Sequence, residues 1–515
     1  MKYSTRAEDW HYAGEGGAHV LFGYCPPTGE STNDGPPRGY LLRLVKLELA
    51  HCLTSNAVNK SDSLDIYITT ANAAVTSEFK TEQKACPLEY LENVVAPCLQ
   101  SYLDVPQLAC VNPALTRALY QQAQDSGEIP SHRRASWRLP NEKDDNCRAK
   151  THDSNATFLQ GLWLRDYRQS PTKLSLSTIP RLTVEIKPKA AYTAVSPLVE
   201  PARRVKYHQC RYQWLHGATS SYRPLDLCSQ STPQIQRALQ ALVDEPRNNL
   251  RVWLGHTPCT DRLAHVLPRR WVAGTTVAHF TNILAHILAQ EHGFLRRIQS
   301  LQKLDVIDSD GAVLIYNHLV HQWLPDSSRE EASRLLDSCG KGVSDKDSAN
   351  LPRKGLHNRL RECPYALLHN LKETSPALNE YLDLVVQIEG VNLLSDCTES
   401  YLGNMRQAAL KLVMNMNRDD CLVLLRMWLL SLAMCDLSFF VGIQVESLHE
   451  VSTVSRDNSE RKQTKSSPGV LLYTLDSKTL RIEYEIKAID CDQKPAKKLN
   501  TRQQKEDGIF AKLKL

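Results

Sequence analysis

The fold class is decided around LTVEIKPK, residues 182–189, where apolar and polar residues alternate with the two-residue period of a β-strand. Strand alternation places Glu185, Lys187 and Lys189 on one face and turns the aliphatic residues between them toward the core. Two cations and a carboxylate then share one surface, as in an anion-binding site. A solvated edge strand that ends at the proline is the alternative interpretation.

Strand-like and helix-like patterns extend in both directions from this stretch. Further strands are expected at 20–24, 40–49, 251–254 and 482–490, and helices at 233–243 and over much of 275–322. Strands lead, and helices dominate the C-terminal half. The sequence therefore predicts an α+β protein.

One apolar run, residues 421–443, is long enough to cross a membrane. It contains Arg426 and Asp436, and each would cost roughly 3 kcal/mol at the centre of a bilayer. We therefore expect no membrane segment, but a buried helix that runs into a buried strand.

Length and charge limit the possible functions. A chain of 515 residues favours two lobes, which we place at 1–163 and 164–515. With 62 Lys+Arg against 57 Asp+Glu, the net charge of +5 is too small to predict general nucleic-acid binding. An anionic partner must be met by locally clustered charges. Nothing in the sequence requires more than a monomer.

The cysteines and the N-terminus bear on the compartment. The 15 cysteines include no C-x-x-C pair, so neither a disulfide framework nor a cysteine zinc site is expected. The N-terminus lacks the apolar region of a signal peptide. We expect a reducing compartment, the cytoplasm, the nucleus or both.

Polar stretches are expected to be loops. Residues 121–155 suit a mobile loop or a lobe boundary, and residues 325–360 and 452–469 have the composition of insertions or flexible loops. Whether the 452–469 loop is regulatory cannot be read from its composition.

A glycine-rich turn, GEGGAH at 14–19, is the first candidate for phosphate binding. Glycines let a hairpin backbone approach phosphate oxygens closely, and Arg43 on the next predicted strand could face the same phosphates. An ordinary tight turn is the alternative, because the freedom of glycine serves any hairpin.

The segment DCDQKPAKK, residues 490–498, is a candidate for joint binding of metal and phosphate. Asp490 and Asp492 offer the hard oxygen ligands that Mg²⁺ needs, and lysines follow them. A solvated charged tail is the alternative. The doublet Asn248-Asn249 with Arg251 either joins this site or simply terminates a helix.

Asp436 is the candidate general base. An ionisable residue in an apolar run is costly unless it is paired, protonated or used, and burial alone would raise its pKa. A carboxylate satisfied by backbone N–H groups at a turn is the alternative. His318 and His321 have helical spacing for a metal, but no third ligand is apparent. The signatures of ordinary protein kinases, P-loop proteins and α/β-hydrolases are absent.

Taken in order, these motifs resemble the inositol-pentakisphosphate 2-kinase family, which phosphorylates the 2-hydroxyl of inositol pentakisphosphate to give the hexakisphosphate. The resemblance spans most of the chain, and its most specific parts are VEIKPK and YRPLDL. It is carried by DWHYAGEGGAHVLF (9–22), LLRLVK (41–46), NVVAP (93–97), SWR (136–138), VEIKPK (184–189), CRY (210–212), YRPLDLCS (222–229), RNNLRVWL (247–254), KLDVIDSDGA (303–312), AMCDLS (433–438) and IDCDQKP (489–495).

The resemblance implies a two-lobed fold distantly like that of protein kinases, with a larger helix-rich C-lobe, and ATP and Mg²⁺ as cofactors. It implies roles for individual residues: Glu15, Gly16, Gly17, His19, Arg43 and Glu185 at the nucleotide; Asp490 and Asp492 at Mg²⁺; Asp436 as base; and Arg138, Lys187, Lys189, Arg211, Asn248, Asn249, Arg251, Lys494 and Lys498 around inositol pentakisphosphate. Five phosphates bring roughly −8 to −10, and these arginines and lysines offer matching positive charge.

Three departures from the family pattern leave an alternative open. His19 stands where the family usually has Asn, and Cys435 where it has Lys before the catalytic Asp. A substrate lysine after CRY has no clear counterpart, although an alignment onto Arg204 and His208 is possible. A catalytically weakened scaffold or inositol-phosphate sensor of the same fold is therefore the alternative. The multikinase type is disfavoured because P-x-x-x-D-x-K-x-G is missing, and no zinc site is expected.

Overall fold

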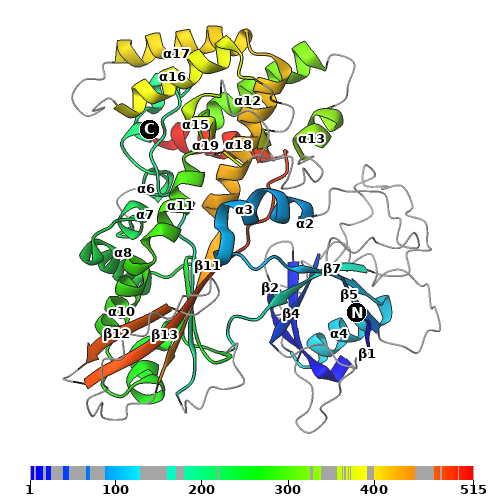
Figure 1. Cartoon of the computed structure of the whole chain (residues 1–515), viewed down its shortest axis with the longest axis vertical. Helices are drawn as coiled ribbons and strands as arrows, with labels where there is room; N and C mark the ends of the chain where they lie inside the picture. Colours follow the sequence, from blue (N-terminus) through cyan, green and yellow to red (C-terminus); the bar gives the residue numbers. More distant parts are fainter. Residues whose placement is uncertain are drawn as a thin grey trace, which may run out of the picture. The chain divides into compact units, whose positions relative to one another are not determined.

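A computed structural model gives the structure of the chain (Figure 1). It describes residues 2–4, 7–15, 19–24, 39–45, 65–69, 87–127, 159–169, 179–216, 220–324, 329–337, 356–361, 363–364, 367–368, 371, 373–390, 399–446, 469–475, 478–496 and 498–513. The chain forms two compact units. Unit 1 comprises 1–88 and 104–175, and unit 2 comprises 89–103 and 176–515. The functional lobes expected at 1–163 and 164–515 stay a prediction.

Unit 1 is built on an antiparallel sheet of seven strands in the order β1-β5-β6-β7-β4-β3-β2. The strands are β1 (Lys2–Ser4), β2 (Trp10–Glu15), β3 (His19–Tyr24), β4 (Tyr40–Val45), β5 (Asp65–Thr69), β6 (Gln107–Val111) and β7 (Leu159–Arg165). Strands β2 and β3 flank the glycine-rich turn and β3 pairs with β4, which confirms the hairpin-like opening read from the sequence. Trp10, Phe22, Leu42 and Trp163 form the core against the sheet.

Among the described residues, two helical segments belong to unit 1. They are η1 (Ala7–Asp9) and α4 (Pro113–Asp125). Helix α4 begins after Asn112, whose side chain accepts a hydrogen bond from the Ala114 N–H at 2.8 Å, and its apolar face supplies Leu115 and Leu119 to the core. The segment α2 (Pro87–Tyr90) spans the junction between the two units.

Unit 2 contains a six-stranded antiparallel sheet in the order β10-β9-β8-β11-β13-β12. Its strands are β8 (Leu182–Ile186), β9 (Leu250–Leu254), β10 (Thr257–Pro258), β11 (Ser438–Val445), β12 (Gly469–Leu475) and β13 (Lys478–Ile489). Strand β8 pairs with β9 on one side and β11 on the other, and all five of its residues are buried. The edge-strand interpretation of LTVEIK is therefore wrong, and its strand assignment is confirmed.

The helices of unit 2 lie beside this sheet and, for the most part, beyond its upper end in Figure 1. They are η3 (Leu91–Val95), α3 (Ala96–Leu99), η4 (Gln100–Tyr102), η7 (Pro201–Tyr207), α6 (Arg211–His216), α7 (Pro224–Leu227), α8 (Thr232–Asp244), η9 (Thr260–Arg262), α9 (Leu263–Val266), η10 (Leu267–Trp271), α10 (Val277–Gln290), α11 (His292–Gln302), α12 (Asp308–His318), η11 (Leu319–Trp323), α13 (Arg329–Asp337), α15 (Asn358–Arg361), α16 (Pro376–Gly390), α17 (Glu399–Met414), α18 (Arg418–Asp436) and α19 (Lys498–Leu513). The predicted helices at 233–243 and within 275–322 are confirmed. The mixture confirms the α+β class.

Helix α18 is the central helix of unit 2. Asn417 and Asp420 form a reciprocal capping box at its start, which satisfies N–H groups that the helix leaves free. From Asp420 to Cys435 every residue is buried, and the chain then passes through Leu437 into the buried strand β11. The expected buried helix running into a buried strand is confirmed. None of the described helices is both long and apolar enough to cross a membrane.

The predicted loops have mixed outcomes. Within 325–360, residues 329–337 form α13, with Ala332 and Leu336 buried, so a wholly flexible insertion is wrong there. The start of 121–155 belongs to α4. The rest of that stretch beyond residue 127, and 452–468, lie outside the described residues.

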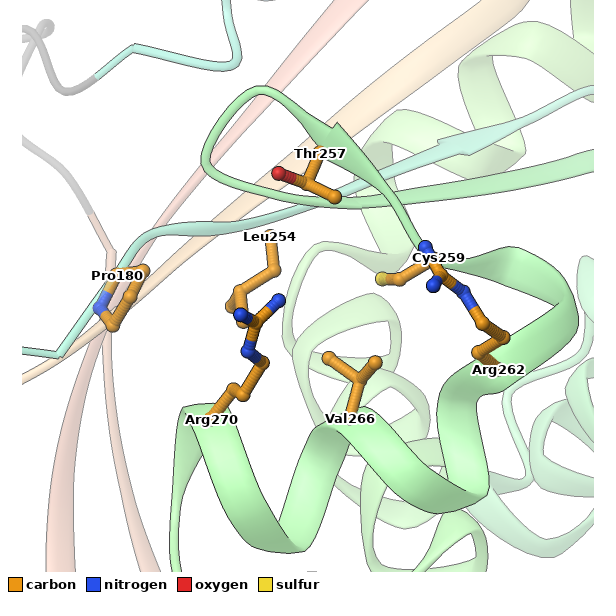
Figure 2. Close-up of a pocket in the computed structure, with 7 residues that line it drawn as sticks. All are labelled: Pro180, Leu254, Thr257, Cys259, Arg262, Val266 and Arg270. Carbon is orange, nitrogen blue, oxygen red and sulfur yellow. The ribbon is translucent and has the colours of Figure 1, made fainter.

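At the end of β8 and β9 where Leu182 pairs with Leu254, the short β9–β10 hairpin and the segment η9–α9–η10 enclose a pocket (Figure 2). The opposite end of the same two strands, where Ile186 pairs with Leu250, carries Glu185 and Arg251, with Lys187 and Asn249 just beyond the strand ends.

Candidate functional site

Asp436 is the last residue of α18 and pairs with Lys494, with 2.9 Å between Oδ2 and Nζ. Its side chain is 64% exposed, so it is not sealed in the core. The surrounding protein withdraws some water and raises the pKa of Asp436, but Lys494, and then Lys189, lower it by more. The net pKa lies below the ordinary value. Burial alone raises the pKa, as expected from the apolar run, but the net direction is reversed because the helix ends where the carboxylate meets its cations.

Asp490 follows β13 and faces Lys187 and Ser438. Its Oδ2 lies 3.5 Å from the Lys187 ammonium and 3.5 Å from the Ser438 hydroxyl, and its side chain is 42% exposed. The backbone of Asp490 is left-handed, with φ +57°. Asp tolerates this conformation better than most residues. Two long contacts and an open side leave the carboxylate able to accept further ligands.

Glu185 on β8 lies directly opposite Arg251 on β9, with 3.8 Å between Oε2 and Nη1. Burial raises the pKa of Glu185, and the nearby carboxylate of Asp490 raises it further. The positive charges of Arg251 and then Lys187 lower it. The net pKa is above the ordinary value. Because Glu185 is influenced by all three charges, the ends of β8, β9 and β13 form one electrostatic cluster.

Lys189 joins this cluster to Asp436. Burial lowers the pKa of Lys189, and Lys187 lowers it further, while Asp436 opposes the change. Its backbone has φ +62°, which is strained for a residue with a side chain. We call the group formed by Glu185, Lys187, Lys189, Asp436 and Asp490, with Arg251 and Lys494, the mixed-charge cluster.

Asn249 is buried beside this cluster. Its carbonyl oxygen accepts a hydrogen bond from the Lys187 N–H at 2.9 Å, and its Nδ2 donates to the Tyr212 hydroxyl at 3.2 Å. Its Oδ1 is buried and has no hydrogen-bond partner in the described part of the chain. Asn248, in contrast, is exposed. Helix α8 ends before both, at Asp244, so simple helix termination does not explain the doublet.

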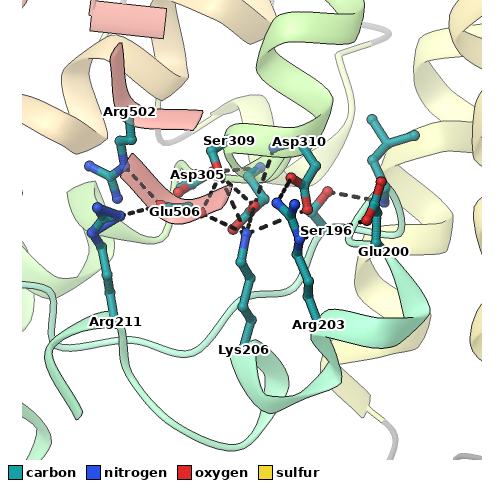
Figure 3. A network of polar contacts seen from close by, with 12 residues as sticks. Ser196, Glu200, Arg203, Lys206, Arg211, Asp305, Ser309, Asp310, Arg502 and Glu506 are labelled. Carbon is teal, nitrogen blue, oxygen red and sulfur yellow. Dashed lines mark hydrogen bonds and ion pairs between the residues drawn. The ribbon is translucent and has the colours of Figure 1, made fainter. Parts of the chain in front are cut away.

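Arg211, expected at the substrate, lies instead in a second charged group (Figure 3). It pairs with Glu506 of α19, which also accepts from Lys206, with 2.8 Å between Oε2 and Nζ. We call this group the buried ion network; it comprises Arg203, Lys206, Arg211, Asp305, Asp308, Asp310, Arg502 and Glu506. The structure therefore gives Arg211 an internal partner, and its substrate role stays a prediction.

Arg502 was not found by the sequence reasoning. It stacks over Trp428 at 5.9 Å, with 3.5 Å between its Nε and Oε1 of Glu506. It follows Lys494 and Lys189 among the cations that lower the pKa of Asp436. Cys435 beside it is buried, and burial raises the pKa of this thiol to about 12, so it stays uncharged. Arg502 of α19 thus places a cation near Asp436, next to the uncharged Cys435. The place of Arg502 near Asp436 depends on long-range packing against Trp428 of α18, which no local sequence pattern signals.

The remaining predicted residues are only partly described. Lys498 begins α19 and is exposed, and Asp492 follows β13 and is half-buried. Arg43 lies on β4 of unit 1. Glu15 ends β2 and His19 begins β3, but their side chains lie outside the described residues, as do Gly16, Gly17 and Arg138 entirely.

These residues fit a divalent cation only if waters and substrate phosphates supply its other ligands. Among the described residues, no three His, Cys, Asp or Glu side chains gather as a metal cluster. Asp490 is an open carboxylate beside the buried Glu185, and Asp492 lies two residues further on. Mg²⁺ commonly takes one or two carboxylates together with waters and substrate phosphates. Asp490 and Asp492 fit that pattern.

Comparison with known proteins agrees with the motifs. The family model for inositol-pentakisphosphate 2-kinase matches residues 12–508. An inositol-pentakisphosphate 2-kinase of Arabidopsis thaliana is 23% identical over 351 residues, which is 62% of this chain and 71% of that protein. Matches to the enzymes of Oryza sativa subsp. indica (26% over 166 residues) and Danio rerio (35% over 104) cover 27% and 18% of this chain, and 36% and 21% of those proteins. Because the family model spans nearly the whole sequence, the chain belongs to the inositol-pentakisphosphate 2-kinase family of phosphotransferases.

Proposed function

We propose that the chain transfers a phosphoryl group from ATP to the 2-hydroxyl of inositol 1,3,4,5,6-pentakisphosphate, giving the hexakisphosphate. The observation that carries this proposal is the mixed-charge cluster, which brings Lys187, Lys189, Asp436 and Lys494 together from segments far apart in the sequence. A polyphosphate needs clustered cations, and phosphoryl transfer to a hydroxyl needs a base among them.

Asp436 serves as the base. Its lowered pKa keeps the carboxylate ionised at neutral pH, and its exposure leaves it accessible to a hydroxyl proton. A weak carboxylate base suits this reaction, because phosphoryl transfer depends mainly on positioning and on stabilisation of charge. Lys494, at 2.9 Å, holds the carboxylate in place and provides a cation for a neighbouring phosphate.

The other cations orient the ring. Lys187, Lys189 and Arg251 lie around the same cluster, and the phosphates of inositol pentakisphosphate would exchange with their present carboxylate partners at 3.5 and 3.8 Å. These contacts are long, so little is lost when a dianion replaces them. Asn248, Asn249, Lys498, Arg211 and Arg138 are proposed to complete the substrate site.

Membership of a kinase family implies the use of ATP. We assign the nucleotide phosphates to Glu15, Gly16, Gly17, His19, Arg43 and Glu185. Asp490 and Asp492 would hold Mg²⁺, which when bound neutralises phosphate charge. The two-lobed, distantly protein-kinase-like arrangement and the cytoplasmic or nuclear location belong to the same proposal; the free thiols of the nine described cysteines support a reducing compartment.

Incubation of the purified chain with inositol pentakisphosphate and Mg·ATP, followed by chromatography of the products, tests the proposal. Formation of the hexakisphosphate is expected. Binding of the pentakisphosphate without turnover would instead support the sensor alternative, which His19 and Cys435 motivate. Retention of Asp436 and Asp490 and the charge supplied by Arg502 favour the enzyme.

A further inference from the structure

The pocket beneath the β9–β10 hairpin lies outside the mixed-charge cluster (Figure 2). It is a cavity of about 480 Å³, within the size range of small-molecule sites. Its lining residues come from the start of β8, the hairpin and the helical segment η9–α9–η10: Pro180, Leu254, Thr257, Cys259, Arg262, Val266 and Arg270.

Two arginines border this pocket without a carboxylate partner. Among the described residues, neither Arg262 nor Arg270 has an acidic group within salt-bridge distance; Arg262 only donates a long hydrogen bond, 3.4 Å, to the Pro258 carbonyl. Both are exposed. Figure 2 shows both guanidinium groups reaching from the helical segment toward the hairpin, on either side of Val266. Two free forks of N–H donors around one hollow match the oxygens of a phosphate group.

Apolar side chains form part of the inner surface of the pocket. Cys259 is buried, and Leu254 and Val266 are half-buried. Burial raises the pKa of the Cys259 thiol to about 11, although Arg262 nearby opposes the increase. The thiol is therefore uncharged at neutral pH and adds to the apolar floor. A ligand that fits must combine an anionic group at the rim with an apolar body inside.

We propose that this pocket binds a small phosphate monoester with an apolar body, with its phosphate between Arg262 and Arg270 and its body against Leu254 and Val266. The dianion of the monoester balances the two guanidinium charges. Thr257, exposed at the rim, adds a hydroxyl donor. An inositol polyphosphate is a poor match, because the phosphates around its ring keep the ring carbons from packing on the floor.

This site does not depend on the proposed catalytic function. Leu254 pairs with Leu182 at one end of β8 and β9, whereas Glu185 and Arg251 pair near the other end. Three residues along a strand separate Arg251 from Leu254, a rise of about 10 Å. A ligand in the pocket thus contacts residues that the mixed-charge cluster does not use.

Calorimetric titration of the full chain with phenyl phosphate tests the proposal. Binding is expected, with inorganic phosphate and benzoate each at least tenfold weaker, because the first lacks the apolar body and the second lacks the second charge. Arg262→Gln and Arg270→Gln should each weaken binding of phenyl phosphate at least tenfold. Arg269→Gln is the matched control, since Arg269 is exposed on the same turn of η10 but does not line the pocket, and it should change binding less than twofold.

Two further variants separate this site from the catalytic one. Val266→Thr should weaken binding of phenyl phosphate at the pocket but leave inorganic phosphate unchanged. Lys187→Gln should leave binding of phenyl phosphate unchanged. Equal losses in Arg269→Gln and Arg270→Gln would overturn the proposal, because binding would then follow surface charge alone. Loss of binding in Lys187→Gln would also overturn it, since the probe would then occupy the mixed-charge cluster.

Discussion

The mixed-charge cluster and the buried ion network are built from the same residue types but differ in how completely their charges are satisfied. In the network, Lys206 and Glu506 are each 2% exposed and lie 2.8 Å apart. In the cluster, the Lys187–Asp490 and Glu185–Arg251 contacts are 3.5 and 3.8 Å, and Asp436 is largely exposed. Charges that are paired and buried hold the fold together, whereas charges whose side chains stay open to solvent, such as Asp436 beside Lys494, remain available to a ligand.

Helix α19 and the segment before it contribute residues to both the network and the cluster. Glu506 of α19 meets Lys206, Arg211 and Arg502, while the segment just before the helix carries Lys494 to Asp436. The network thus fixes the helix, and the helix start positions the cation beside the proposed base. Variants in the two groups should therefore separate activity from stability.

The largest expected effect is on turnover in Asp436→Asn. Loss of the base should lower kcat by about 10²–10⁴-fold, while inositol pentakisphosphate still binds. The measurement is chromatographic turnover together with calorimetric binding. Asp419→Asn in the first turn of the same helix is the matched control and should keep near-normal turnover. Full activity of Asp436→Asn would remove the base assignment.

In the network, Glu506→Gln should chiefly reduce stability. Burial raises the pKa of Glu506, but Arg211 and Lys206 lower it by more, so the wild-type carboxylate is charged and balances buried cations. Removing that charge should cost about 3–5 kcal/mol of unfolding free energy, measured by denaturant titration. Asp507→Asn, one residue on and about half exposed, should cost less than about 1 kcal/mol. Equal losses in the two variants would contradict the distinction between buried and open charges.

In the buried ion network, Asp305→Asn should change how stability depends on pH. Burial, with Asp308 beside it, raises the pKa of Asp305 from 3.8 to about 6. The folded state therefore holds a proton there that the unfolded state loses, so this group costs stability as pH rises from about 4 through 6. The asparagine variant lacks that cost. Its stability relative to wild type should increase by about 1–3 kcal/mol between pH 4 and pH 7.5. Unfolding curves at both pH values provide the measurement, and a difference independent of pH would contradict the raised pKa.

The sequence predicted the elements of the site better than their electrostatics. Alternation in LTVEIKPK identified β8 and its charged side chains, and the apolar run 421–443 identified α18 and β11. These are local patterns with a fixed period, so they can be read from one chain. The strand position of β8 inside the sheet, which turns Glu185 from a surface residue into a buried one, depends on pairing with segments far away in sequence.

Charge pairing was the part that local patterns could not supply. Nothing near Arg211 in the sequence indicates that Glu506 neutralises it, and nothing near Cys435 indicates Arg502. Likewise, the direction of the pKa change at Asp436 depends on Lys494, which arrives from the far end of β13. A carboxylate in an apolar run has a raised pKa only if no cation reaches it.

The smallest expected effect concerns that cation, in Lys494→Gln. Without the Lys494 ammonium, burial raises the pKa of Asp436, and only the weaker effects of Lys189 and Arg502 oppose that increase. Because the base must be ionised, the acid limb of the kcat/KM profile should move to higher pH, by less than about one unit. Lys505→Gln on the exposed side of α19 is the matched control and should leave the profile in place. A fall in kcat/KM by the same factor at every pH would mean that Lys494 acts only on substrate phosphate, and the pair with Asp436 would then have no part in setting the charge of the base.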